Sequence, residues 1–211
     1  MNLSSLVSRS MARLGLPAAL GLLAILVFLP SRNFLESSMA RHMLVQYPLL
    51  MLCGALLAGG LSTALADRAL VWELREFPTS SWNAYGMTGL FGTALGLALL
   101  MIPRVLDLAL INPWVEFIKM TILVASGASI YMSWRPAGWL VQGFFLGQVL
   151  PMMAVAGTLY ESSPTRVCNA YLLNDQVLLG QLLVWIAAGT ALAWLAALFR
   201  SLIRRSTVPA V

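Results

Sequence analysis

The sequence predicts an all-α protein, a polytopic bundle of about six transmembrane helices. Two observations predict this class. Of the 211 residues, 60% are hydrophobic and only 10% are charged, whereas soluble domains carry roughly 25% charged residues. Six apolar segments also approach the roughly 20 residues that a helix needs to cross a bilayer core about 30 Å thick. A soluble catalytic domain has no room in such a chain.

The predicted spans follow one another closely and form a single integral membrane domain, residues 1–211. Arg13 precedes the first span, where a long side chain can reach the interface. Pro103 closes the third span, and Pro113 suits the first turn of the fourth. Residues 104–112 are expected to lie along the interface, and Pro151 is the one clear interruption inside a span. The spans cover residues 14–29, 39–64, 85–102, 113–133, 136–160 and 176–199.

The basic residues predict the orientation. Six spans place both termini on one side of the membrane. If that side is the cytoplasm, eight of the thirteen Lys and Arg residues lie in cytoplasmic segments, including Arg200, Arg204 and Arg205 after the last span. Cytoplasmic loops carry such an excess, so both termini are predicted to be cytoplasmic. The net charge of +5 is dispersed, which argues against a nucleic-acid partner.

Small residues at helical spacing predict where helices pack closely. Gly92 and Gly96 in the third span, and Gly143 and Gly147 in the fifth, have the spacing that lets two membrane helices approach. The two cysteines are not expected to pair, because Cys53 lies within a span and Cys168 lies in a polar connection. These features predict one packed bundle.

One imidazole and several sulfur side chains are predicted near the outer face. His42 lies at the start of the second span between Met39 and Met43, Met153 lies in the outer half of the fifth span, and Cys168 lies in the last outer connection. Thioether, thiolate and imidazole ligands together suit Cu(I). Alternatively, the methionines fill gaps in an apolar core and the histidine is a polar partner between helices. Both interpretations stay open.

The remaining polar residues do not form a catalytic motif. Glu116 and Lys119 are three residues apart on the fourth span, close enough to pair, and we expect both near the interface. Asp175 precedes the sixth apolar segment and is well placed to cap it. No metalloprotease, phosphate-binding or Ser/His/Asp pattern occurs. The sequence therefore predicts a protein that is not an enzyme.

Two segments resemble the membrane-embedded assembly factors of caa3-type cytochrome c oxidase. The second-span motif of that family reads approximately His-Met-x-x-His-Met, and the chain has Ser38-Met39-Ala40-Arg41-His42-Met43. The family's last-span motif resembles Asp-Gln-x-x-x-Gly-x-x-x-Trp. The chain has Asp175 and Gln176, then Gly180, with Trp185 one place later. The first histidine of the family is Ser38 here.

The resemblance implies a copper-delivery factor, a chaperone for a respiratory haem-copper oxidase in the bacterial cell inner membrane. It implies Cu(I) ligation by His42 with Met39 or Met43 at the outer face, assisted by Met153 or Cys168. Asp175 and Gln176 would support these ligands. The alternative expectation is a non-catalytic accessory subunit of a larger respiratory membrane complex, with no bound metal and with the lipid bilayer as its surroundings.

Overall fold

The computed structural model describes residues 3–66 and 81–206, and within these ranges all regular structure is helical, with no strand. Four helices of this part are long and apolar enough to cross a membrane: Met39–Ser62, Pro113–Ser133, Gly138–Ser162 and Leu173–Ile203. Two bent pairs of helices raise the number to six if each pair is one span. The prediction of an all-α membrane bundle is confirmed.

The helices follow the predicted spans with shifted ends. The fourth span is α8, which begins and ends where predicted, and α10 begins three residues earlier than its predicted span. Residues 67–80, which contribute to the predicted cytoplasmic charge, lie outside the described residues. The elements are α1 (Leu3–Val27), α2 (Leu29–Glu36), α3 (Met39–Arg41), the π-helix η1 (His42–Gln46), α4 (Tyr47–Ala66), the 3-10 helix η2 (Ser81–Gly86), α6 (Met87–Leu100), α7 (Pro103–Ile111), α8 (Pro113–Ser133), α9 (Gly138–Ser162) and α10 (Leu173–Ser206).

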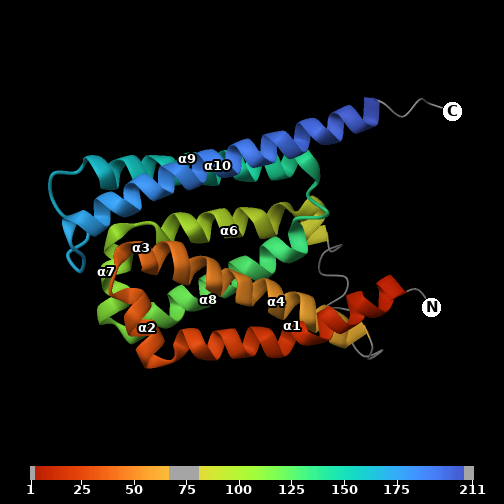
Figure 1. The fold of residues 1–211 in the computed structure, drawn as a ribbon, viewed down its shortest axis with the longest axis horizontal. Helices are drawn as coiled ribbons and strands as arrows, with labels where there is room; N and C mark the ends of the chain where they lie inside the picture. Colours follow the sequence, from red (N-terminus) through yellow and green to blue (C-terminus); the bar gives the residue numbers. More distant parts are fainter. Residues whose placement is uncertain (1–2, 67–80, 207–211) are drawn as a thin grey trace.

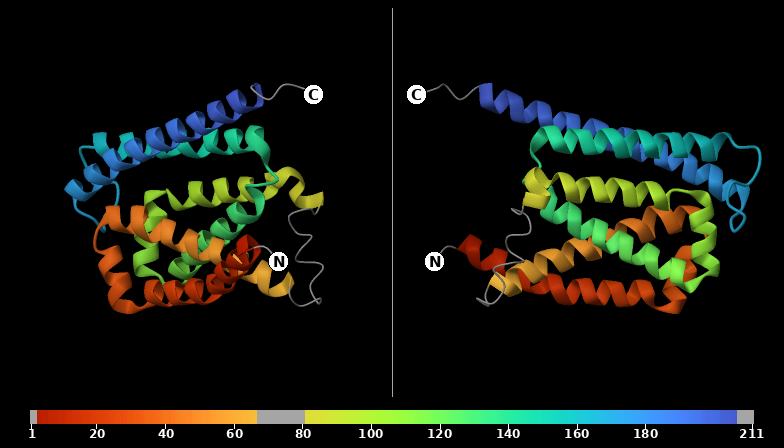
Figure 2. Two further views of the ribbon diagram at one scale, coloured as in Figure 1. Left: turned by 45° about the vertical axis from the view of Figure 1, so that its right-hand side comes forward. Right: turned by 180° about the vertical axis from the view of Figure 1, so that it is seen from behind.

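The helices form a sheaf in which α1, α4, α8, α6, α9 and α10 pack in that order (Figures 1 and 2). The first turns of α1 and the last turns of α10 lie at the same end of the molecule (Figure 1). This arrangement fits an even number of crossings. Which side of the membrane that end faces stays a prediction.

Two sharp bends form the opposite end. The axis turns by 68° between α1 and α2, and by 75° between the helix Asn83–Leu100 and α7. Pro30 and Pro103 lie in the first turns of α2 and α7, where a missing N–H costs no hydrogen bond. Residues 104–112 were expected at the interface and form most of α7. Helix α2 was not predicted, because residues 30–38 were assigned to a connection.

The break after α6 leaves backbone carbonyls without helical partners. Such groups are costly within a bilayer unless another part of the protein binds them. The hydroxyl of Tyr47 donates to the carbonyl of Leu100 at 3.4 Å, and the hydroxyl of Tyr160 donates to that of Met101 at 3.0 Å. Two helices distant in sequence therefore stabilise this bend.

Glycines set the closest helix crossings, at positions other than those predicted. A Cβ on Gly54 of α4 or on Gly127 of α8 would overlap the backbone of the facing helix. Gly157 and Gly180 form the same kind of contact between α9 and α10. In each predicted pair, one glycine lies at a helix contact: Gly96 faces Ile122, and Gly143 faces Trp194. A Cβ added at Gly92 or Gly147 would meet no atom within 4 Å.

Candidate functional site

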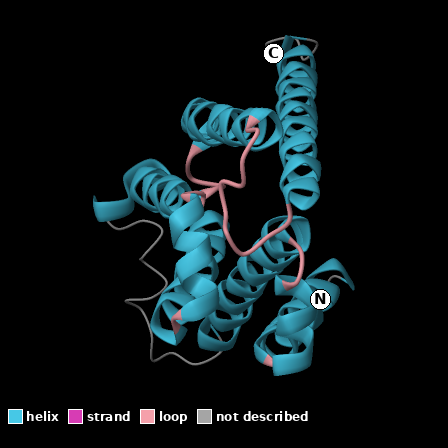
Figure 3. Cartoon of the chain, turned by 90° about the vertical axis from the view of Figure 1, so that its left-hand side faces the viewer, coloured by secondary structure: helices cyan, strands magenta, loops and turns pink. Residues whose placement is uncertain are grey.

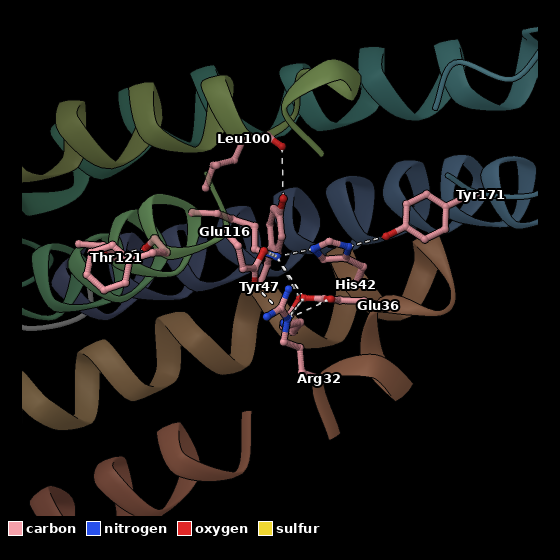
Figure 4. A network of polar contacts seen from close by, with 11 residues as sticks. Arg32, Glu36, His42, Tyr47, Leu100, Glu116, Thr121 and Tyr171 are labelled. Atoms are coloured by element: carbon pink, nitrogen blue, oxygen red, sulfur yellow. Dashed lines mark hydrogen bonds and ion pairs between the residues drawn. The ribbon is translucent and has the colours of Figure 1, made fainter. Parts of the chain in front are cut away.

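Polar side chains gather inside the bundle at the end closed by α2 and α7 (Figure 4). They come from four separate segments of the chain, and four of them are almost fully buried: His42, Gln46, Glu116 and Lys119. Ionisable groups within a membrane protein are rare and mark functional regions. The whole network comprises Arg32, Glu36, His42, Gln46, Glu116, Lys119 and Tyr171.

Two cations and two anions balance the charge of the network. Lys119 Nζ lies 2.7 Å from Glu116 Oε2 and 3.7 Å from Glu36 Oε1. Arg32 Nε lies 3.0 Å from Glu36 Oε1 and 3.8 Å from Glu116 Oε1. The predicted pairing of Glu116 with Lys119 is confirmed, but both face inward rather than the interface, and the Lys119 side chain is only 1% exposed. Pairing offsets the large cost of removing each ion from water.

Both ring nitrogens of His42 have protein partners. Nε2 lies 2.7 Å from Lys119 Nζ, and Nδ1 lies 2.5 Å from the hydroxyl oxygen of Tyr171. An ammonium group only donates hydrogen bonds, so Nε2 is the acceptor. The ring proton is then on Nδ1, which donates to Tyr171. His42 thus links the charges of α2 and α8 to the connection between α9 and α10.

The π-helix η1 turns two residues toward Lys119. His42 and Gln46, at its two ends, are both buried, and Gln46 Oε1 lies 3.5 Å from Lys119 Nζ. Pro48 lies two residues after Gln46, and a proline has no N–H for the carbonyl four residues earlier and crowds it. The wider π turn accounts for how the helix accommodates Pro48. Single π turns inside α-helices are frequent at functional sites.

The connection 163–172 between α9 and α10 closes this end of the bundle (Figure 3). Gln176 Oε1 accepts from the backbone N–H of Val167 at 2.8 Å, and its amide nitrogen donates to the carbonyl of Tyr160 at 3.0 Å. Asp107 of α7 accepts from the N–H groups of Asn169 at 3.0 Å and Ala170 at 3.3 Å. These bonds fix the segment that carries Tyr171.

Cys168 belongs to this connection, and its thiol is buried. Its Sγ donates weakly to the carbonyl of Pro103 at 3.8 Å. Burial, and then the negative charge of Asp107, raise the pKa of the Cys168 thiol to about 12. The thiolate is the form that binds a metal or attacks an electrophile. Cys53 is also buried, and both cysteines are free.

The structure brings the predicted sulfur ligands into one apolar cluster. Met39, Met43 and Cys168 belong to it, and Met153 packs against it. His42 does not present a free nitrogen, however, and Cys168 is held as a thiol. No group of three or more His, Cys, Asp or Glu among the described residues is placed to hold a metal ion. As arranged, these donors do not fit a copper site built on His42 and Cys168.

The predicted supporting residues have different positions. Gln176 is buried and holds the connection, as described above. Asp175 lies in the first turn of α10, because that helix begins at Leu173. It was expected to precede the helix as its cap, and that expectation is corrected. At this position its charge still faces the positive end of the helix dipole.

Four members of the network were not identified from the sequence. Arg32 and Glu36, spaced four apart, lie on the unpredicted helix α2, and their spacing was the available signal. Gln46 is likewise four residues after His42. Tyr171 had no signal, because only the fold brings residue 171 to residue 42.

The fold and this network define a multi-pass helical membrane protein with a neutral, buried set of charges at one end. Searches against protein-family models, curated proteins and solved structures gave no match. The resemblance to oxidase assembly factors therefore stays a prediction.

Proposed function

We propose that the chain is a non-catalytic accessory or assembly factor of a larger membrane complex, a respiratory haem-copper oxidase in a bacterial inner membrane. One observation supports this proposal most. The two segments that carry the resemblance meet at the connection 163–172, where His42 contacts Tyr171 and Gln176 binds the backbone of Val167. The motif side chains therefore hold the exposed surface of this connection in a fixed shape.

That surface suits the recognition of a partner. Asp107 and Gln176 hold the connection in place by hydrogen bonds. Little conformational entropy of this segment is therefore lost when it binds a partner protein. Its outward side chains are exposed and of mixed character: Pro164, Thr165, Arg166, Asn169 and Ala170. We place the contact with the oxidase here.

This proposal is tested by placing a photo-crosslinking residue at position 166 and irradiating membranes of the cells that naturally make the protein. Crosslinks to an oxidase subunit, identified by mass spectrometry, are expected from position 166. The matched control is position 192, since Leu192 is exposed on α10 away from the connection. A strain without the gene should also assemble less oxidase, measured by its haem absorbance. Normal oxidase assembly together with no crosslink from position 166 would contradict the proposal.

Copper delivery is a second candidate, supported by the sulfur cluster of Met39, Met43 and Cys168 with Met153 beside it. Thioethers bind Cu(I) without losing a proton, so the methionines are better placed than Cys168 or His42. Anaerobic Cu(I) titration of the purified protein tests this. Binding that is lost in the Met39→Leu/Met43→Leu variant and kept in His42→Ala supports copper delivery. Absence of Cu(I) binding by the wild type removes it.

A further inference from the structure

Lys119 lies at the centre of a shell of acceptor atoms. Its Nζ is 2.7 Å from Glu116 Oε2 and 2.7 Å from His42 Nε2. Gln46 Oε1 at 3.5 Å and Glu36 Oε1 at 3.7 Å complete the shell. These acceptors come from α2, η1 and α8, three elements that only the fold brings together (Figure 4).

His42 and Gln46 are each held toward this point by a second contact. Tyr171 binds the other nitrogen of His42, so the lone pair of Nε2 faces Lys119. The amide nitrogen of Gln46 donates to Glu36 Oε1 at 3.4 Å, which turns the amide oxygen to Lys119. Neither oxygen of Glu116 has a hydrogen bond of good geometry, and its side chain is only 4% exposed. A buried carboxylate in this state requires a nearby cation.

From this geometry we infer that the network is a cation-binding site whose cation is supplied by the chain itself, the Lys119 ammonium. Imidazole nitrogen, carboxylate and amide oxygens converging on one point are the ligands of a cation site. With the lysine side chain removed, the same shell becomes a site for a small primary ammonium ion. This inference does not depend on the proposed function.

The charge balance agrees with this role. Without Lys119, two buried carboxylates would face only Arg32, whose Nε is already 3.0 Å from Glu36 and 3.8 Å from Glu116. Removing one partner of a buried ion pair is strongly destabilising, because it leaves an uncompensated charge. Arg32 is also the network member that reaches the surface, with a side chain 26% exposed. An added ion can approach the site beside it.

Rescue of Lys119→Ala by propylammonium tests the inference, because this ion replaces the atoms that the substitution removes. The full chain is purified in detergent, and its unfolding temperature is measured in propylammonium chloride and in tetramethylammonium chloride at equal concentration. Propylammonium is expected to raise the unfolding temperature of Lys119→Ala by about 2–4 °C. Wild type and Lys119→Leu, in which an apolar side chain fills the space, should show no such difference. An equal response in all three proteins, or in none, overturns the inference.

A charge-balanced variant covers the case in which Lys119→Ala does not fold. Glu116→Gln removes one carboxylate, so Glu116→Gln/Lys119→Ala restores equal numbers of buried positive and negative charges. It should be more stable than Lys119→Ala, or yield folded protein where the single variant does not. A double variant that is no more stable than the single one means that Lys119 does not act as the cation of this site, and contradicts the inference.

Discussion

The group of α1, α4, α8 and α6 is held together differently from the α9–α10 hairpin. The apolar stretch of a span is 33% buried in Met39–Ser62 and 28% buried in Pro113–Ser133. The corresponding values in the hairpin are 17% for Gly138–Ser162 and 11% for Leu173–Ile203. Four of the buried or half-buried charges belong to α2 and α8. The hairpin contributes no charge to this network, and large apolar side chains of α10 such as Trp185 and Phe199 are exposed.

This difference indicates how the hairpin is positioned. Tyr171 and Tyr160 attach it at the end that holds the charge network, through His42 and the carbonyl of Met101. A small apolar cluster of Leu90, Ala137, Phe145 and Val149 joins α9 to α6. Most of the remaining surface of α10 has no protein neighbour and is left to the bilayer. The hairpin shares the core of the helix group mainly at this end, where Tyr160, Leu179 and Leu183 belong to the main buried cluster.

The largest expected effect comes from Gly127→Ala in the helix group. The added Cβ would overlap the backbone carbonyl of Met51, and overpacking of this kind costs about 3 kcal/mol. Unfolding in detergent, followed by circular dichroism, measures the loss. Gly147→Ala is the matched control, because Gly147 faces open space inside α9, and it should raise stability by up to about 1 kcal/mol. Equal effects at the two positions would mean that the α4–α8 crossing does not limit stability.

A smaller effect is expected from Gln176→Leu, within the hairpin at the start of α10. The substitution leaves the N–H of Val167 and the carbonyl of Tyr160 without their partner, at a cost of about 1 kcal/mol. Hydrogen exchange should become faster in residues 163–172 and stay unchanged in α4 and α8. Gln181→Leu is the control, since Gln181 is exposed and binds only Glu161. Faster exchange throughout the helix group would show that the two regions unfold as one unit.

The smallest effect concerns reactivity rather than stability. Because the pKa of Cys168 is raised to about 12, by burial and then by Asp107, its alkylation rate should keep rising with pH and not level off near pH 9. Removal of the negative charge in Asp107→Asn lowers this pKa, so the rate at a given pH increases. A maleimide assay in a Cys53→Ser background measures the Cys168 rate alone. A plateau near pH 9 in the wild type would contradict the buried thiol.

Particular residues indicate how far the sequence predicts this protein. The spans are predictable because a bilayer accepts only long apolar helices, and α8 ends where its hydropathy ends. The breaks between helices are harder to predict from the sequence. Pro151 lies inside the continuous helix α9, whereas Pro30 and Pro103 lie in the first turns of the bent helices α2 and α7. At the break before Pro103 the carbonyls of Leu100 and Met101 accept from Tyr47 and Tyr160, two partners that only the fold brings there.

The sequence by itself determined the membrane class, the approximate spans and the pairing of Glu116 with Lys119, because these depend on local composition and on spacing along one helix. The tertiary structure alone decided what His42 contacts. Residues 42, 119 and 171 meet through helix packing, which spacing along the chain does not encode. The all-helical membrane bundle predicted at the outset is therefore retained, and its single histidine is placed beside the buried side chain of Lys119.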